Sequence, residues 1–122
     1  MTTKVILDTN ALLMPFQFGI NLSTELKRLL GAFEIVVPSS VLDELKGLKP
    51  KNLAKAAEAL SLRFKVWSTE EKGDEAIVSL AKELKAVVVT NDKRLMEALR
   101  KLKLPVIHLR SRTHLVLSGS FL

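Results

Sequence analysis

The chain contains no cysteine, and this absence removes several kinds of chemistry at once. It excludes a disulfide framework, a thiolate zinc site and a cysteine nucleophile. Long apolar runs are also missing, since none approaches the roughly 20 residues that a membrane-spanning helix needs. Residues 1–4 lead into the apolar run 5–7 without the apolar core or cleavage site of a secretory signal. We therefore expect a protein without a membrane span that stays in the cytoplasm.

Positive charge is in excess and is concentrated toward the C-terminus. Nineteen Lys and Arg residues stand against 13 Asp and Glu residues, which gives a net charge of +6. The basic residues from position 93 onward are Lys93, Arg94, Arg100, Lys101, Lys103, Arg110 and Arg112. Such a region suits a polyanion, but a solvated lysine-rich face carries the same charge. Charge alone therefore leaves nucleic-acid binding open.

Apolar runs and helical patterns alternate along a chain that has the size of one compact domain. The expected strands are 4–7, 34–37, 86–89 and 106–109, with 64–67 as a weaker candidate. The expected helices are 10–15, 21–30, 40–48, 52–64, 74–84 and 93–102. This alternation predicts a three-layer α/β/α fold with a parallel sheet of about five strands. Ligands of such folds bind beyond the carboxyl ends of the strands.

Two of the expected strands are followed by an acid at their carboxyl ends, where ligands of such folds bind. Asp8 directly follows the run 5–7, and Asp92 lies three residues after Val89. A carboxylate that follows a buried strand must be hydrogen-bonded, paired or metal-bound to offset its desolvation, which favours a functional Asp8. Asp92 has a structural alternative, because Asp is a good N-cap and a helix is expected from Lys93.

Two further acids lie on helices, and their angular positions separate them from their acidic neighbours. Glu44 lies at the margin of the apolar face of its helix, whereas Asp43 points away and is expected to form a capping box with Ser40. Asp74 lies nearer the apolar stripe of its helix than Glu75, which points outward. A helix-start role for Asp74 is an equally open interpretation, since an acid there complements the helix dipole.

The chemistry of these acids indicates a metal. Four converging carboxylates repel one another unless a cation neutralises them. Oxygen ligands without His or Cys suit Mg²⁺ or Mn²⁺, and such ions promote hydrolysis of phosphodiesters. The two histidines, His108 and His114, stand in no obvious position for a general acid, and we interpret both as structural or surface residues.

Four segments in this order resemble the PIN-domain nucleases. They are Ile6–Asn10, Val37–Leu45, Gly73–Ile77 and Val88–Asp92. The resemblance implies a metal-dependent endoribonuclease with the sheet order 3-2-1-4-5. It assigns catalysis and metal binding to Asp8, Glu44, Asp74 and Asp92, with Asn10, Thr90 and Asn91 as supporting residues. The third motif often carries two adjacent aspartates in the family, and here the second position is Glu75, which we expect to be dispensable.

Within the family, the chain looks most like archaeal relatives of the nuclease that cuts precursor ribosomal RNA in the small-subunit processome. A VapC-type toxin, held by an antitoxin, is the nearest alternative, and a non-catalytic RNA-binding protein is the alternative of another class. A response-regulator receiver needs adjacent acids after its first strand, where Thr9 and Asn10 follow Asp8. A haloacid-dehalogenase-type phosphatase needs a second aspartate two residues after Asp8, where this chain has Asn10.

The resemblance also sets the expected domain and partners. Residues 1–114 are expected to form one PIN-like domain, and 115–122 an apolar C-terminal tail that docks on it or lines a subunit contact. RNA is expected to approach over five basic residues, Lys93, Arg94, Arg100, Arg110 and Arg112. A homodimer is expected from the family alone, and an antitoxin or a pre-ribosome partner follows from the two subfamily alternatives.

Overall fold

The apolar runs form a single sheet of six strands in the order β3-β2-β1-β4-β5-β6. The computed structural model describes residues 2–119. The strands are β1 (Thr3–Leu7), β2 (Phe33–Pro38), β3 (Lys65–Trp67), β4 (Val87–Val89), β5 (Val106–Arg110) and β6 (His114–Ser118). The first five pair in parallel in the expected order, and β6 pairs antiparallel with β5. The predicted α/β fold with the strand order 3-2-1-4-5 is therefore confirmed, with one strand more than expected.

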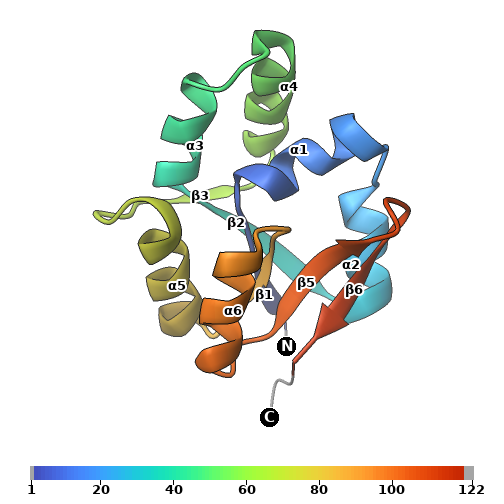
Figure 1. Ribbon diagram of the computed structural model, residues 1–122, viewed down its shortest axis with the longest axis vertical. Coiled ribbons are helices and arrows are strands. Elements are labelled where there is room, and N and C mark those ends of the chain that lie inside the picture. The colour runs from blue at the N-terminus through green and yellow to red at the C-terminus, as the bar shows by residue number, and fades with distance from the viewer. Residues whose placement is uncertain (1, 120–122) are drawn as a thin grey trace.

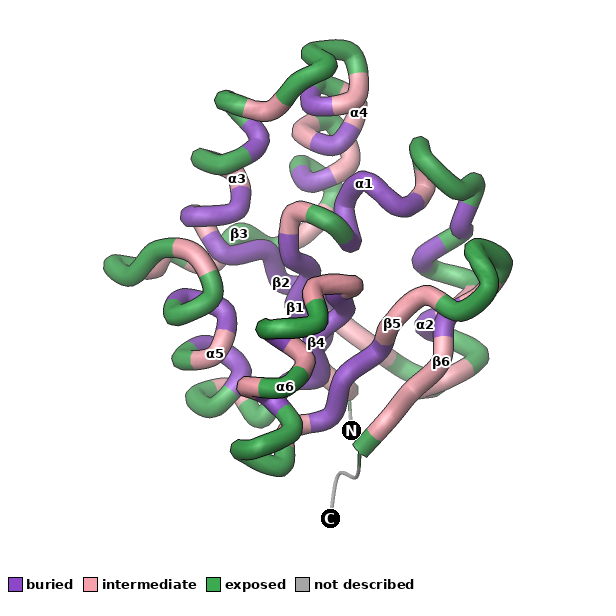
Figure 2. Tube along the Cα trace, in the orientation of Figure 1, coloured by how far each residue is buried: buried purple, intermediate pink, exposed green. Residues whose placement is uncertain are grey.

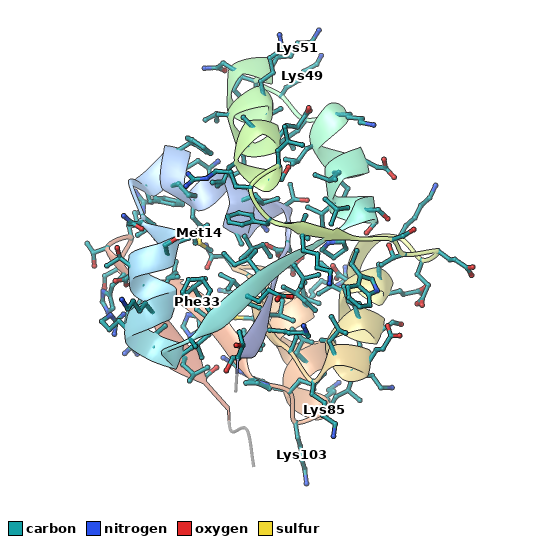
Figure 3. The ribbon with its side chains drawn as sticks, turned by 180° about the vertical axis from the view of Figure 1, so that it is seen from behind. Met14, Phe33, Lys49, Lys51, Lys85 and Lys103 are labelled. Carbon is teal, nitrogen blue, oxygen red and sulfur yellow. The ribbon has the colours of Figure 1, made fainter. Side chains whose placement is uncertain are left out.

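Helices cover both faces of this sheet and gather beyond one of its edges (Figure 1). They are α1 (Thr9–Phe18), α2 (Leu22–Leu30), α3 (Ser39–Lys46), α4 (Lys51–Ser61), α5 (Gly73–Leu84) and α6 (Lys93–Lys101). Helices α5 and α6 lie on one face and α2 on the other, as Figures 1 and 3 show from opposite sides. Helices α1, α3 and α4 pack on one another beyond the carboxyl ends of β1 and β2. No helix within residues 2–119 is long and apolar enough to cross a membrane.

The two central strands form the floor of the core. All residues of β4 and the last three of β1 are completely buried, as Figure 2 shows for the middle of the sheet. Their register pairs Leu7 with Val89. Asp8 and Thr90 therefore follow at the same level on neighbouring strands. This is the place that the sequence predicts for the two strand-end residues.

The C-terminal segment differs from the expected tail. Residues 114–118 form β6, so the expected boundary at 114 cuts through a strand, while residues 120–122 lie outside the described part of the chain. Leu115 is fully buried, and α2 holds its backbone through two side chains. The Leu115 N–H donates to Glu25 Oε1 at 2.8 Å, and Arg28 Nη2 donates to the Leu115 carbonyl at 2.7 Å.

The turn before β6 explains why no hairpin is evident in the sequence. Ser111 and Arg112 have φ of 55° and 59°, a succession of positive φ values like that of the type I′ turns that favour Asn-Gly. The other described non-glycine residues with positive φ are Lys85 (53°) and Lys103 (60°). An L-residue in this conformation costs roughly 1–2 kcal/mol. Four positions therefore carry side chains where glycine or asparagine would be less strained.

Candidate functional site

Asp8 and Thr90 form the buried centre of the site at the ends of β1 and β4. Asp8 is 5% exposed and Thr90 is completely buried. Asp8 Oδ1 accepts a hydrogen bond from the Ala11 N–H at 2.8 Å, so Asp8 is also the N-cap of α1. Asp8 Oδ2 accepts a short hydrogen bond from the Thr90 hydroxyl. Both oxygens of this carboxylate are thus held in fixed directions.

The Thr90 hydroxyl also links Asp8 to Asp92. The Asp92 N–H donates to Thr90 Oγ1 at 3.0 Å, and Asp92 Oδ1 accepts from the Arg94 and Leu95 N–H groups at 2.9 and 3.2 Å. Asp92 is therefore the N-cap of α6, as its structural alternative predicts, and it also lies beside Asp8. Its Oδ2 accepts no hydrogen bond from residues 2–119. The two interpretations of Asp92 are compatible, because each uses a different part of the carboxylate.

Asn91 fastens the same loop to the next strand. Its Oδ1 accepts a hydrogen bond from the Leu109 N–H of β5 at 2.9 Å. The loop between β4 and α6 is thereby held on both sides, by Thr90 toward β1 and by Asn91 toward β5. Asn10, the third residue expected to support the site, is exposed and makes no side-chain hydrogen bond within residues 2–119.

Glu44 is brought to the site by α3 and is held by a residue that the sequence reasoning missed. Thr9 Oγ1 donates a hydrogen bond to Glu44 Oε2 at 2.8 Å. Thr9 is the first residue of α1, directly after Asp8, so the turn that buries Asp8 turns the Thr9 hydroxyl toward α3. The two partners are 35 positions apart, and no local sequence pattern reports their contact.

Asp74 completes the group from the start of α5. Its pKa is raised, first by partial burial and then by the nearby Asp92 and Glu44 carboxylates, while Arg94 opposes the rise. The pKa of Asp8 is raised from 3.8 to about 6, mainly by burial, with smaller contributions from Asp92 and Asp74. The four predicted acids therefore lie close enough for their charges to interact. Glu75, next to Asp74, is exposed.

The expected capping box at Ser40 and Asp43 is absent. Helix α3 already begins at Ser39, with Pro38 at the N-cap position, so Ser40 lies inside the helix and cannot cap it. Its buried hydroxyl has no hydrogen-bond partner within the described residues. Asp43 instead lies 4.0 Å from the Lys46 ammonium on the exposed side of the helix. The prediction that Asp43 points away from the acids fits this contact, whereas its proposed capping role was wrong.

These residues fit a hydrated divalent cation better than a fully enclosed one. Within residues 2–119, no three carboxylate or imidazole groups lie close enough to form a ready cage for a metal. Mg²⁺ typically keeps several waters and takes only one or two protein carboxylates, together with phosphate oxygens of a substrate. The Asp8 carboxylate is an oxygen donor that suits such an ion. Burial and the neighbouring acids disfavour its negative charge, which a cation would offset.

The five basic residues expected to bind RNA do not form one cluster. Lys93 and Arg94 open α6 directly after Asp92, whereas Arg100 lies in its last turn, about 10 Å farther along the helix axis. Arg110 ends β5 and Arg112 lies in the following turn, at the same carboxyl edge of the sheet as the acids. Lys93 and Arg94 are therefore nearest to the acids, and Arg100, which contacts Ser118 at 3.4 Å, is remote from them.

Comparison with known proteins identifies the family. The family model described as "PIN like domain" matches residues 5–112, and the chain belongs to the PIN-domain family. Ribonuclease VapC4 of Methanocaldococcus jannaschii is 34% identical over 127 residues, covering 95% of this chain and 97% of that protein. Ribonuclease VapC9 of Archaeoglobus fulgidus is 28% identical over 111 residues, covering 86% and 82%.

A solved structure agrees with this assignment. The PIN domain endonuclease Utp24 superposes with a TM-score of 0.82 at 26% identity, covering 96% of this chain and 92% of that one. The resemblance to PIN-domain nucleases, with Utp24-like and VapC-like relatives, is thereby confirmed.

Proposed function

We propose that this protein is a divalent-metal-dependent endoribonuclease that hydrolyses RNA phosphodiester bonds. Its active site would consist of Asp8, Glu44, Asp74 and Asp92. The observation that carries the proposal is the buried Asp8 carboxylate. Its pKa is raised to about 6, mainly by burial and to a smaller extent by the neighbouring acids. A protein that only bound RNA would have no need for this destabilising group. The relatives named as ribonucleases and the structural likeness to a PIN endonuclease support the same activity.

The chain's own residues have distinct tasks in this proposal. Asp8 supplies the most rigid carboxylate, because both of its oxygens are held by hydrogen bonds. Asp92 contributes its free Oδ2, and Thr9 orients Glu44. A bound Mg²⁺ or Mn²⁺ would act as a Lewis acid toward the phosphodiester and offset the charge that develops during its hydrolysis. Asp74, whose pKa is also raised, would be held in its charged form by the same cation.

RNA would enter over the carboxyl edge of the sheet. Lys93 and Arg94 flank the acids, and Arg110 and Arg112 extend the positive surface along the same edge. Because these contacts are to phosphates, binding should weaken steeply with salt. Arg100 is the weakest member of the expected set, since it lies at the far end of α6.

The test is cleavage of a structured RNA by the wild-type protein and by Asp8→Asn and Asp92→Asn. Each reaction is run with Mg²⁺, with Mn²⁺ and with EDTA. We expect cleavage by the wild type only with metal, and a loss of about 1000-fold in Asp8→Asn, corresponding to about 4 kcal/mol of transition-state stabilisation. Lys27→Gln, on the exposed side of α2, is the control and should cleave like the wild type.

The outcomes separate the alternatives. Cleavage that persists in EDTA or in both variants would point to a contaminating nuclease and reject the mechanism. RNA binding without cleavage under any metal condition would favour the non-catalytic RNA-binding protein. A thermal melt adds a readout that does not depend on activity, since Mn²⁺ bound to the folded site should raise the Tm by about 5 °C. An unchanged Tm in millimolar Mn²⁺ would argue against the site.

A VapC-type toxin is the second candidate function, favoured by the 34% identity to Ribonuclease VapC4. A toxin needs an apolar surface for its antitoxin, and α1 and α4 offer one. Phe16 and Leu62 are 43% and 80% exposed. A cavity of about 400 Å³ lies between these helices and α2, lined by residues that include Pro15, Ile20, Leu60, Arg63 and Phe64. Phe16 lines a neighbouring hollow that shares Pro15, Leu60 and Arg63 with this cavity, and exposed apolar residues beside a hollow are typical of a protein-binding surface.

Expression in a host cell distinguishes the toxin from a ribosomal RNA maturation enzyme. A toxin should arrest growth when expressed alone, Asp8→Asn should not, and a small neighbouring gene should relieve the arrest. Normal growth with altered precursor ribosomal RNA would favour maturation instead. A homodimer and a cytoplasmic location stay predictions.

A further inference from the structure

Two lysines occupy strained positions at the end of the molecule opposite the acids. Lys85 is the left-handed C-cap of α5, with φ of 53°, and Lys103 follows the end of α6 with φ of 60°. The two turns lie side by side because they lead into the neighbouring strands β4 and β5. Figure 3 shows both side chains projecting from this end.

The same chain uses glycine at the left-handed C-cap of α1, where Gly19 has φ of 68° and ψ of 24°. Gly31, after α2, also has a positive φ of 74°, but its ψ of −127° places it outside the left-handed helical region. A positive charge near a helix C-terminus is favourable, and this accounts for Lys82 and Lys101 in the last turns of α5 and α6. It does not account for lysine at the left-handed position itself, where glycine is the less strained residue.

We call these four residues the basal lysine cluster: Lys85 and Lys103, which project from this end in Figure 3, and Lys82 and Lys101 in the last turns of the two helices that end here, with Glu83 as an exposed acid beside Lys82 in the chain. All four are exposed. None of them takes part in an ion pair within residues 2–119, where the pairs are Lys4–Glu34, Arg28–Glu25 and Lys46–Asp43. The cluster lies at the amino edge of the sheet, separated from the acids by the length of a strand, about 16 Å for five residues.

We propose that the basal lysine cluster is a second RNA-binding surface, which contacts backbone phosphates of the substrate away from the cleaved bond. The inference rests on the proposed ribonuclease function, because that function supplies a polyanion longer than the acidic site. Lysine is a compact point charge, which suits phosphate contacts that carry no sequence information. The strain at Lys85 and Lys103 is then a stability cost retained for binding, as is common at functional positions.

The proposal predicts opposite effects on stability and on binding. In Lys85→Gly/Lys103→Gly, relief of the left-handed strain should raise the Tm by about 4 °C, even after the extra chain entropy of glycine is counted. Binding to an RNA of about 20 nucleotides should weaken about tenfold. The slope of log K against log salt should fall by about 1.5, as expected for two lost phosphate contacts.

Two further measurements make the test specific. Lys85→Arg/Lys103→Arg keeps the charge and the strain, so it should keep the wild-type Tm and affinity. An RNA of about 2 nucleotides spans about 7 Å at the stacked rise of 3.4 Å per nucleotide, and even when fully extended it is too short to reach from the acids to the cluster. In Lys85→Gly/Lys103→Gly, the affinity for this short RNA should fall much less than the affinity for the long RNA. Lys27→Gln/Lys51→Gln, which removes two exposed charges elsewhere, is the control for net charge.

Binding is measured by fluorescence anisotropy in EDTA, so that cleavage does not interfere. Wild-type affinity and salt slope for the long RNA in the glycine variant would overturn the proposal and point to an acidic protein as the partner of this surface. An equal loss for both RNAs, or an equal loss in Lys27→Gln/Lys51→Gln, would overturn it as well. Length-dependent binding by a wild type that cleaves nothing with Mg²⁺ or Mn²⁺ would support this surface while rejecting the proposed ribonuclease function.

Discussion

The buried centre and the exposed rim of the acidic site are built by different means. The centre consists of Asp8, Thr90 and Asp92 at the ends of β1 and β4, and hydrogen bonds hold each of them in place. The rim consists of Glu44 and Asp74, which are exposed and reach the site from α3 and α5. Glu44 has one hydrogen bond, from Thr9, and Asp74 makes none within residues 2–119.

The difference separates a rigid part of the site from an adjustable one. Backbone hydrogen bonds hold Asp8 and Thr90, whose N–H groups donate to the Val89 and Ile107 carbonyls, and burial makes any movement of the two side chains costly. The rim acids sit on helices whose positions depend on side-chain packing, and water can replace their partners. We therefore expect changes at the centre to have large effects with a stability component, and changes at the rim to have smaller effects on activity alone.

The largest effect is expected from Asp8→Asn, which should destroy activity and stabilise the fold. Burial raises the pKa of Asp8 from 3.8 to about 6, so the folded state holds its proton more tightly than the unfolded state. This carboxyl therefore destabilises the fold progressively as the pH rises from about 4 to about 6, and the full penalty remains at pH 7. Asn carries no charge, and without metal the variant should be more stable at pH 7 by roughly 1–3 kcal/mol.

Urea unfolding of both proteins between pH 4 and pH 7 measures this difference. The gap between them should widen with pH up to about 6 and then stay constant. A variant that is less stable than the wild type at pH 7 would show that hydrogen bonds outweigh the cost of the buried charge, and the description of the centre would be wrong.

Thr90→Val should come next, with a loss of about 10- to 100-fold in activity. The Thr90 hydroxyl donates to Asp8 and accepts from the Asp92 N–H, so its removal frees both acids. Because this hydrogen bond lowers the pKa of Asp8, the acidic limb of the pH–activity profile should move to higher pH. Thr90→Ser keeps the hydroxyl and should restore both properties. A profile that does not move would mean that Thr90 acts only by packing.

The buried centre of the site is easier to predict from the sequence than the contacts of its exposed rim. Asp8 and Asp92 were identified because a parallel sheet brings the ends of its strands to one edge, and this needs only the strand assignment. The sheet order and the four-acid set follow from the family resemblance, and the confirmed fold brings those acids together. Contacts of the rim depend on how α3 and α5 pack, which explains why the Thr9–Glu44 hydrogen bond was missed.

The two errors, on β6 and on Asp43, have different causes. Strand β6 was predicted as a tail because its turn has Ser111 and Arg112 at positive φ instead of the residues that mark hairpins. The stabilising contacts come from Glu25 and Arg28, about 90 positions away in the chain. The capping role of Asp43 failed because α3 begins one residue earlier than a cap at Ser40 requires.

On the rim, Thr9→Val should reduce activity by about 3- to 10-fold. The change keeps the shape of the side chain and removes the donor to Glu44 Oε2, so Glu44 loses its one direct restraint among the described residues. The hydrogen bond is exposed, and the Tm should change by no more than about 2 °C. Activity measured as a function of Mn²⁺ concentration should show a higher requirement for metal, and Thr9→Ser should return to the wild-type curve. A large fall in Tm would place Thr9 with the centre.

The smallest effect is expected from Glu75→Gln, which should stay within about twofold of the wild type in activity. Glu75 follows Asp74 on α5, and one helical step turns it by about 100° away from its neighbour, into solvent. Asp74, by contrast, lies close enough to Asp92 and Glu44 for their charges to raise its pKa. Asp74→Asn, the matched variant one position away, should therefore lose at least about tenfold more activity. Equal losses in the two variants, measured at saturating Mn²⁺, would mean that the rim acts through its total charge, and the position of each acid on its helix would then be irrelevant.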